Sequence, residues 1–174
     1  DLGFLGKTLE AEKRPGHYEG VIQIVKKLLD IVQPNLLFLG QKDYQQCMVI
    51  QKLIDTFNIP TKIVICTTKR EADGLAMSSR NVRLSDAARK VALKLFQALT
   101  DIQNRFKTEN IAQIIAENIN FLNQDNLIET EYLVVVNGKT LEPILEYNEQ
   151  IPITALVAAK VGEVRLIDNL ILQA

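Results

Sequence analysis

Two patterns of apolar residues alternate along the first part of the chain. Apolar side chains recur at three- and four-residue spacing over 18–32 and again over 44–57, which predicts two helices that each bury one face. Short, wholly apolar runs at 36–39 and 63–66 predict two strands that are buried on both faces. The order helix, strand, helix, strand with short links predicts parallel pairing and an α/β layer.

The pattern changes after Cys66. Residues 67–81 are polar and charged and show no steady period, as expected of a connection between two folded parts. We therefore place a domain boundary in this stretch, with one domain over 1–67 and a second over 68–174.

The second half of the chain predicts two helices followed by a small sheet. Ser85 starts a long helix and Thr108 caps another, because short hydroxyl side chains satisfy the first backbone N–H groups of a helix. Turn signals at Asn137-Gly138 and at Gly162 lie between or beside strand-like runs, which favours antiparallel pairing. Those runs cover 128–136, 153–159 and 164–167.

Polar residues are concentrated where the first strand ends. Gly40, Gln41, Lys42 and Asp43 form a strand-to-helix turn, and α/β sheets bind phosphates and small polar ligands at such turns. Glycine permits positive φ and close ligand approach, and the lysine adds a mobile charge. The carboxylate can cap the helix, accept from a ribose hydroxyl or hold Mg²⁺. The turn lacks the P-loop pattern, and a helix cap with a solvated lysine is the alternative.

Two glutamines and a second polar cluster extend this candidate site. Gln45 and Gln46 offer paired donors and acceptors to an uncharged polar substrate. Within 69–81, two adjacent serines precede Arg80, and this combination can hold phosphate oxygens. A charged linker between domains is the alternative interpretation of that segment.

A third group is the turn Arg14-Pro15-Gly16-His17, which proline and glycine punctuate. The turn can aim Arg14 into a site or leave it solvated, and His17 is equally well a structural hydrogen bonder. His17 is the single histidine of the chain, which excludes a multi-histidine metal site. We find no Ser-His-Asp or Cys-His set around this one histidine, unless residues outside the chain complete one, and this favours electrostatic stabilisation of a transferred phosphoryl or nucleotidyl group.

Composition and charge narrow the class of protein. With 47% hydrophobic and 24% charged residues the chain is ordinary for a globular protein, and its net charge of −1 argues against a nucleic-acid or membrane-surface role. It has no apolar run near the ~18–20 residues that span a bilayer, and we expect no signal peptide, since the first residues lack a basic segment followed by an apolar core. Cys47 and Cys66 are expected to be reduced core or near-core thiols, which fits the cytoplasm. Because the chain starts at Asp1, we expect a cut piece of a longer protein.

Four segments occur in the order and spacing of one enzyme family. They are 14–17 (Arg-Pro-Gly-His), 40–46 (Gly-Gln-Lys-Asp-Tyr-Gln-Gln), 70–81 (Arg-Glu-Ala-Asp-Gly, then Met-Ser-Ser-Arg-Asn) and 165–169 (Arg-Leu-Ile-Asp-Asn). Together they extend over essentially the whole chain, which resembles the pantothenate synthetase (pantoate–β-alanine ligase) family.

The resemblance implies a reaction and a fold. ATP and pantoate form pantoyl adenylate and pyrophosphate, and β-alanine then gives pantothenate and AMP. Mg²⁺ accompanies ATP, and the enzyme is a cytoplasmic homodimer without nucleic-acid or membrane partners. The implied fold is α/β: the C-terminal part of a Rossmann-like nucleotidyltransferase domain over 1–67, then a small α+β domain of the lid or dimerisation type over 68–174.

The resemblance also assigns roles in the first half of the chain. Gly40, Gln41, Lys42 and Asp43 match the ATP-binding turn, with Lys42 on phosphate and Asp43 near the ribose or the metal. Gln46 matches the glutamine that hydrogen-bonds pantoate. Lys42 is one of two residues that the resemblance implies are catalytic.

In the second half, Met77, Ser78, Ser79 and Arg80 match a flexible ATP-binding segment that covers the triphosphate. Arg80 is the other residue implied to be catalytic. Lys69 stands where the family usually has a valine that contacts adenine through its backbone.

The turn at 14–17 and the segment at 165–169 also match the family, whereas an upstream signature of the family is missing. Arg14 and His17 match residues that support the active site, and 165–169 looks structural. The family's upstream His-x-Gly-His signature and an upstream glutamine are absent, so we expect this chain to be inactive alone and its uncovered strands to self-associate. Another adenylate-forming nucleotidyltransferase, or a non-catalytic dimerising module, remain as alternatives.

Overall fold

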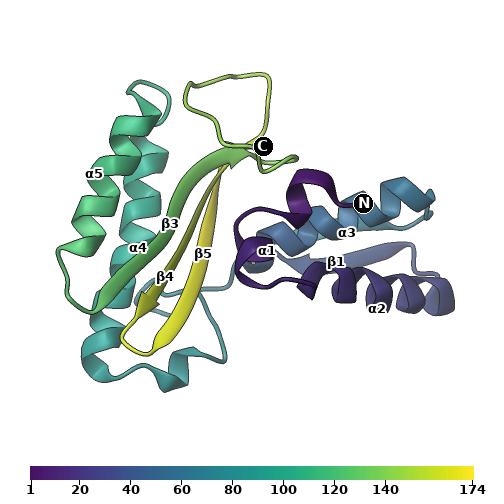
Figure 1. Ribbon diagram of the computed structural model, residues 1–174, viewed down its shortest axis with the longest axis horizontal. Helices are drawn as coiled ribbons and strands as arrows, with labels where there is room; N and C mark the ends of the chain where they lie inside the picture. The colour runs from purple at the N-terminus through teal and green to yellow at the C-terminus, as the bar shows by residue number, and fades with distance from the viewer. The chain divides into compact units, whose positions relative to one another are not determined.

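The computed structural model describes residues 1–174 and divides them into two compact units, Asp1–Thr67 (unit 1) and Thr68–Ala174 (unit 2). Each unit has its own sheet (Figure 1). Each also has its own apolar core.

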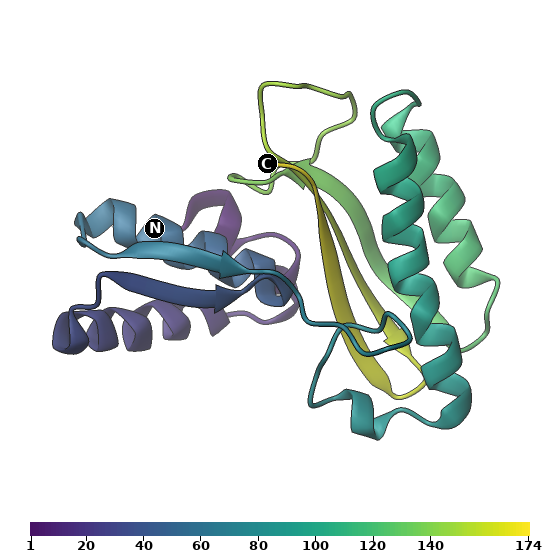
Figure 2. The ribbon, with the colours of Figure 1, turned by 180° about the vertical axis from the view of Figure 1, so that it is seen from behind.

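Unit 1 is built on a two-stranded parallel sheet. Strands β1 and β2 pair in parallel and point the same way in Figure 2, and α3 makes the connection between them. The predicted order of helix, strand, helix and strand with parallel pairing is therefore confirmed. The elements, with η for a 3₁₀ helix, are η1 (Gly3–Gly6), α1 (Glu10–Lys13), α2 (His17–Val32), β1 (Leu36–Gly40), η2 (Gln41–Asp43), α3 (Tyr44–Phe57) and β2 (Lys62–Cys66).

The apolar core of unit 1 lies on one face of its sheet. Leu36 and Phe38 of β1 point to the other face and are 48% and 62% exposed. The prediction that this strand is buried on both faces is wrong in this chain, because α2 and α3 pack against the same face. The core comprises Leu29, Ile50, Leu53 and Ile54, with Leu37, Leu39 and Ile63 packed against them.

Several apolar side chains of the helices that the spacing predicted to face inward are exposed as well. Leu28 and Val32 of α2 and Phe57 at the end of α3 are each more than half exposed. Cys47 is buried as predicted, and this burial raises the pKa of its thiol to about 12. Cys66 is exposed because it ends β2 on the uncovered face, so the prediction of a near-core thiol is wrong there.

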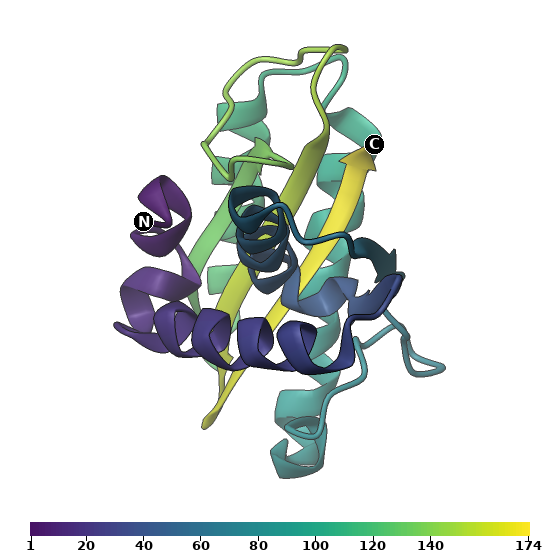
Figure 3. The ribbon, with the colours of Figure 1, turned by 90° about the vertical axis from the view of Figure 1, so that its right-hand side faces the viewer.

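Unit 2 is a three-stranded antiparallel sheet with strand order β3–β4–β5. Helices α4 and α5 cover one face of it and lie behind the strands in Figure 3. This confirms the prediction of two helices followed by an antiparallel sheet. The bounds are η3 (Asn81–Arg83), α4 (Asp86–Arg105), α5 (Ile111–Asn123), β3 (Ile128–Asn137), β4 (Ile153–Val161) and β5 (Val164–Gln173). In neither unit is a helix both long enough and apolar enough to cross a membrane.

One of the two predicted helix caps of unit 2 is confirmed. The hydroxyl oxygen of Ser85 accepts a hydrogen bond from the Ala88 N–H at 3.2 Å and so caps α4. Helix α5 is capped by Asn110, whose side-chain oxygen accepts from the Gln113 N–H at 3.0 Å. Thr108 lies too early to cap α5, and its hydroxyl donates to the carbonyl of the preceding helix instead.

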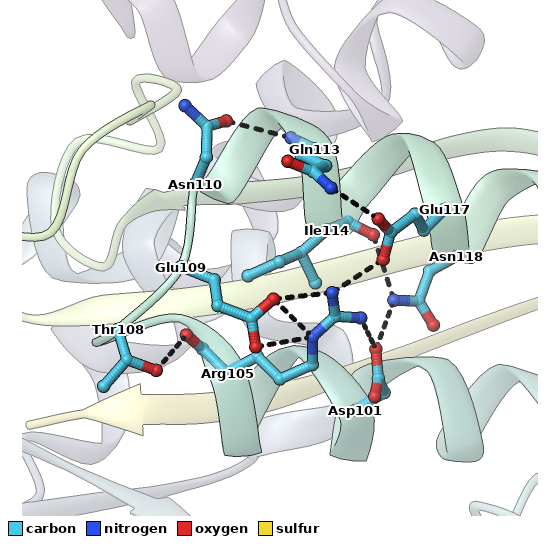
Figure 4. A network of polar contacts seen from close by, with 9 residues as sticks. All are labelled: Asp101, Arg105, Thr108, Glu109, Asn110, Gln113, Ile114, Glu117 and Asn118. Atoms are coloured by element: carbon cyan, nitrogen blue, oxygen red, sulfur yellow. Dashed lines mark hydrogen bonds and ion pairs between the residues drawn. The ribbon is translucent and has the colours of Figure 1, made fainter.

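A polar network closes the turn between α4 and α5 (Figure 4). The Arg105 guanidinium contacts the carboxylates of Asp101, Glu109 and Glu117 at 2.9, 2.7 and 2.6 Å. The hydrogen bond from Arg105 lowers the pKa of Glu117, and that carboxylate belongs to the other helix. One arginine therefore joins the end of α4 to the face of α5.

Candidate functional site

The turn after β1 has the predicted position but not the predicted backbone. Gly40 is extended, with φ −75°, so the reason for a glycine there is not positive φ. A Cβ atom at Gly40 would meet nothing within 4 Å. The space above the strand end is thus open in this chain, and the close approach of a ligand remains available.

Asp43 and Lys42 project from this turn. Asp43 occupies the N-cap position of α3, but its side chain makes no capping hydrogen bond and is exposed. The prediction that Asp43 caps the helix is therefore wrong, and its carboxylate stays accessible at the positive end of the helix. Lys42 is half-buried beside it, and Gln41 is buried.

The two neighbouring glutamines of α3 differ completely in environment. Gln45 is 4% exposed, and its amide nitrogen donates to the carbonyls of Leu5 and Thr8 at 2.8 and 3.0 Å. Its amide oxygen accepts from the Glu10 N–H at 3.0 Å. Gln45 therefore holds the first segment of the chain against α3, and the prediction that it meets a substrate is wrong. Gln46 is half-buried, and its amide has no partner.

The turn Arg14-Pro15-Gly16-His17 leads into α2 and carries the single histidine of the chain. Gly16 has φ +77° at the N-cap of α2, a conformation that favours glycine. Burial and the Arg14 charge lower the pKa of His17, while the charges of Glu10 and Asp43 raise it. Charges from two of the three predicted clusters therefore act on one imidazole.

The single histidine makes these electrostatics measurable. We expect the pKa of His17 to lie below its ordinary value of 6.5, since partial desolvation and Arg14 oppose its protonation. Arg14→Gln should raise this pKa and Asp43→Asn should lower it. Titration of the His17 ring protons by NMR measures each value.

The pH dependence of the free energy of unfolding provides a second test of the lowered His17 pKa. Between the lowered pKa and 6.5 the unfolded chain binds more protons than the folded one, so stability should fall as the pH drops through this window. His17→Gln should remove that dependence. A His17 pKa at or above 6.5 in the folded protein would contradict the assignment.

The third predicted cluster lies in unit 2 and forms a small hairpin. Arg70 and Ala76 pair in an antiparallel bridge, and the Met77 N–H donates to the Lys69 carbonyl at 2.9 Å. Beyond the hairpin, Met77 is 51% exposed and Arg80 is exposed as well.

The residues after the hairpin have hydrogen-bond donors without a partner in the protein. The hydroxyl oxygen of Ser78 accepts from the Arg80 N–H at 3.2 Å, which tightens the backbone. Ser79 and the Arg80 guanidinium have no partner, and the Lys69 N–H has none either. This segment can therefore offer hydroxyl, amide and guanidinium groups to an anion.

Other polar residues of the same cluster are engaged inside unit 2. Arg70 pairs with Asp168 of β5, and Arg89 of α4 pairs with Glu71 and Asp73. These partners were not anticipated, since residues 70 and 168 have no local pattern that joins them. The alternative interpretation of 69–81 as a charged linker between domains therefore does not describe these side chains, which bond within unit 2.

No group of three or more His, Cys, Asp or Glu side chains is arranged to hold a metal ion. An ion at Asp43 would need most of its ligands from a bound molecule and from water, which is usual for Mg²⁺ on nucleotides.

Comparisons with known proteins agree with one another. A family model described as Pantoate-beta-alanine ligase matches residues 2–171. Pantothenate synthetase from Cytophaga hutchinsonii is 44% identical over 174 residues, which are 99% of this chain and 62% of that protein. The chain thus spans less than two thirds of that relative's length.

Two solved structures are similar over nearly the whole chain. Pantothenate synthetase from Thermus thermophilus gives a TM-score of 0.91 at 35% identity and covers 99% of this chain and 62% of that one. Pantoate-beta-alanine ligase from Francisella tularensis, complexed with beta-gamma ATP and beta-alanine, gives 0.69 at 33% identity, with 97% and 55% covered.

Proposed function

Because the chain belongs to the pantoate-beta-alanine ligase family, we propose that its protein joins pantoate to β-alanine in a reaction driven by ATP. The family match over 2–171 carries this proposal. The pantoate carboxylate attacks the α-phosphorus of ATP, pyrophosphate leaves, and pantoyl adenylate forms. The β-alanine amine then attacks the acyl carbon, loses a proton, and AMP leaves.

In this proposal the turn after β1 binds ATP. The open space above Gly40 admits the nucleotide, next to the backbone of Gln41. Lys42 meets the triphosphate and stabilises the negative charge that develops as pyrophosphate leaves. Asp43, exposed at the start of α3, meets the ribose or a Mg²⁺ ion that the triphosphate oxygens hold.

The exposed segment of unit 2 supplies the other phosphate contacts. Met77, Ser78, Ser79 and Arg80 cover the triphosphate, and the unpartnered guanidinium of Arg80 forms charge-assisted bonds to it. The Lys69 N–H has no partner in the hairpin and is available for a backbone contact to adenine.

Arg14 and His17 support the site from the start of α2. The charges of Arg14 and Asp43 both act on the pKa of His17, and this coupling favours the role. The lowered pKa of His17 keeps its ring neutral at pH 7, so the ring adds no positive charge beside the nucleotide.

The decisive experiment compares this chain with a chimera. The chimera joins this chain to the N-terminal part of the Cytophaga hutchinsonii relative, of which the chain matches 62%. We expect pantothenate, AMP and pyrophosphate to form from ATP, pantoate and β-alanine with the chimera and not with this chain alone. A well-folded chimera without turnover would contradict the proposed function, and turnover by this chain alone would contradict its expected inactivity.

Gln46 distinguishes pantoate ligation from other adenylate-forming reactions. In the chimera, Gln46→Ala is expected to raise the KM for pantoate about 3–10-fold, since one neutral hydrogen bond contributes about 0.5–1.5 kcal/mol. The KM for ATP should stay nearly unchanged. Steady-state kinetics with each substrate varied in turn measures both values.

A matched control comes from the same helix. The side chain of Gln51 donates to Asp55 at 2.8 Å, so Gln51→Ala should leave both KM values unaltered. If Gln46→Ala also left the KM for pantoate unaltered, another acid would become the better candidate for the substrate.

A second role rests on the exposed apolar side chains of unit 1, which lie both on the uncovered face of its sheet and on the outside of α2. Leu36, Phe38 and the α2 residues Ile24 and Ile31 are between 48% and 79% exposed, which is typical of a surface that another chain covers. We propose that the protein is a cytoplasmic homodimer and that this chain alone self-associates. Light scattering that gives a single monomeric species over a range of concentrations would count against self-association.

A further inference from the structure

A largely buried ion pair anchors the start of the exposed segment to the sheet of unit 2. The Arg70 guanidinium donates to both carboxylate oxygens of Asp168 at 2.7 and 3.0 Å, and the Asp168 side chain is 6% exposed. The same guanidinium lies 3.7 Å from the ring centre of Phe96 and donates to the Gly74 carbonyl at 3.1 Å. Arg70 therefore joins β5, α4 and the hairpin at one point.

A second cluster anchors the hairpin to α4. Arg89 donates to Glu71 at 2.6 Å and to Asp73 at 2.7 Å. The hydrogen bond from Arg89 lowers the pKa of Glu71. This cluster fastens the hairpin strand and its tip to the helix.

The far end of the exposed segment is tied back to the same cluster. The Asn81 amide nitrogen donates to Glu71 at 2.7 Å and to the Ala76 carbonyl at 3.0 Å, and Asn81 is 6% exposed. Residues 77–80 thus lie between two anchored points, while the Ser79 and Arg80 side chains have no partner. A backbone held on both sides presents these groups with little loss of freedom on binding.

We propose that Arg70, Asp168 and Arg89 are positioning residues that make 77–80 a rigid part of unit 2. The hydrogen-bond donors of 77–80 are then already ordered when a triphosphate binds. The triphosphate part rests on the proposed function. The resemblance implied a flexible segment, whereas these contacts hold its backbone on both sides within unit 2. The residues touch no substrate and act through the backbone of the segment.

Hydrogen–deuterium exchange of this chain tests the anchoring without any substrate. Asp168→Asn removes the buried charge and keeps the shape, and Arg89→Gln breaks the second cluster at a side chain that is 34% exposed. We expect either change to speed exchange of amides in 71–81 about tenfold, as the loss of a charge-assisted hydrogen bond implies. Amides of β4 should keep their rates.

Two further variants separate anchoring from general loosening. Glu131→Gln breaks the bidentate pair that Arg165 makes across the same sheet, with contacts of 2.9 and 3.0 Å, and should leave 71–81 unaltered. Arg89→Lys keeps the charge and should restore part of the protection. Unaltered exchange of 71–81 in both anchoring variants, or an equal rise in β4, would overturn the inference.

Steady-state kinetics of the chimera tests the positioning role. Asp168→Asn and Arg89→Gln should each raise the KM for ATP and leave the KM for β-alanine unaltered. Faster loop exchange with an unaltered KM for ATP would overturn the positioning role. A folded chimera that makes no pantothenate would count against the proposed function alone, since the exchange measurement still decides the anchoring.

Discussion

Replacement of Arg80 by alanine is expected to lower kcat/KM for ATP about 10²–10³-fold in the chimera, because one preorganised donor to developing charge is lost. The Arg80 side chain is exposed and bonds to no other residue, so its removal should leave the fold intact. Initial rates of pyrophosphate release at varied ATP concentration measure the effect, and circular dichroism checks the fold.

Arg83 provides the matched control for this prediction. It is also exposed, lies three residues further along, and ends η3. Arg83→Ala should change kcat/KM for ATP less than about threefold, as expected of an exposed charge that contributes only to the overall electrostatic field. Equal losses in both variants would mean that net positive charge, and not a contact of Arg80, accounts for the effect.

Leu99→Ala should have the largest effect on stability. Leu99 is 0% exposed in the core between α4 and the sheet of unit 2. Truncation removes buried methyl groups and leaves a cavity, which lowers the free energy of unfolding by about 2–5 kcal/mol. Urea unfolding of this chain, followed by circular dichroism, measures the change.

Leu145→Ala makes the same truncation at the surface. Leu145 is 63% exposed, so the free energy of unfolding should change by no more than about 0.5 kcal/mol. If Leu99→Ala were equally mild, the core of unit 2 would have to be far more adaptable than its close packing indicates.

The secondary structure of this chain was largely predictable, because each element has a local signal. Helical spacing and short apolar runs predicted the elements of unit 1, and Ser85 marked the start of α4. The cap of α5 was misplaced at Thr108, since both Thr108 and Asn110 are good capping residues and only the observed geometry separates them.

The side chains of the candidate site were predictable as clusters but not in their individual environments. Gln45 and Gln46 are neighbours of the same type. Gln45 makes three hydrogen bonds to the first segment of the chain, whereas the Gln46 side chain has no partner. The difference arises because successive residues of a helix point about 100° apart, toward different surroundings. Asp43 likewise stands at a helix start without capping it.

The sequence by itself determined the family resemblance, the order of helices and strands, and the three polar clusters, because all of these depend on residues that are close along the chain. Tertiary structure alone decided which face of β1 is covered, and it joined Arg70 to Asp168 across 98 positions. It also brought His17 within reach of the charge on Asp43. These features depend on how distant segments pack, and no local period or spacing encodes that packing.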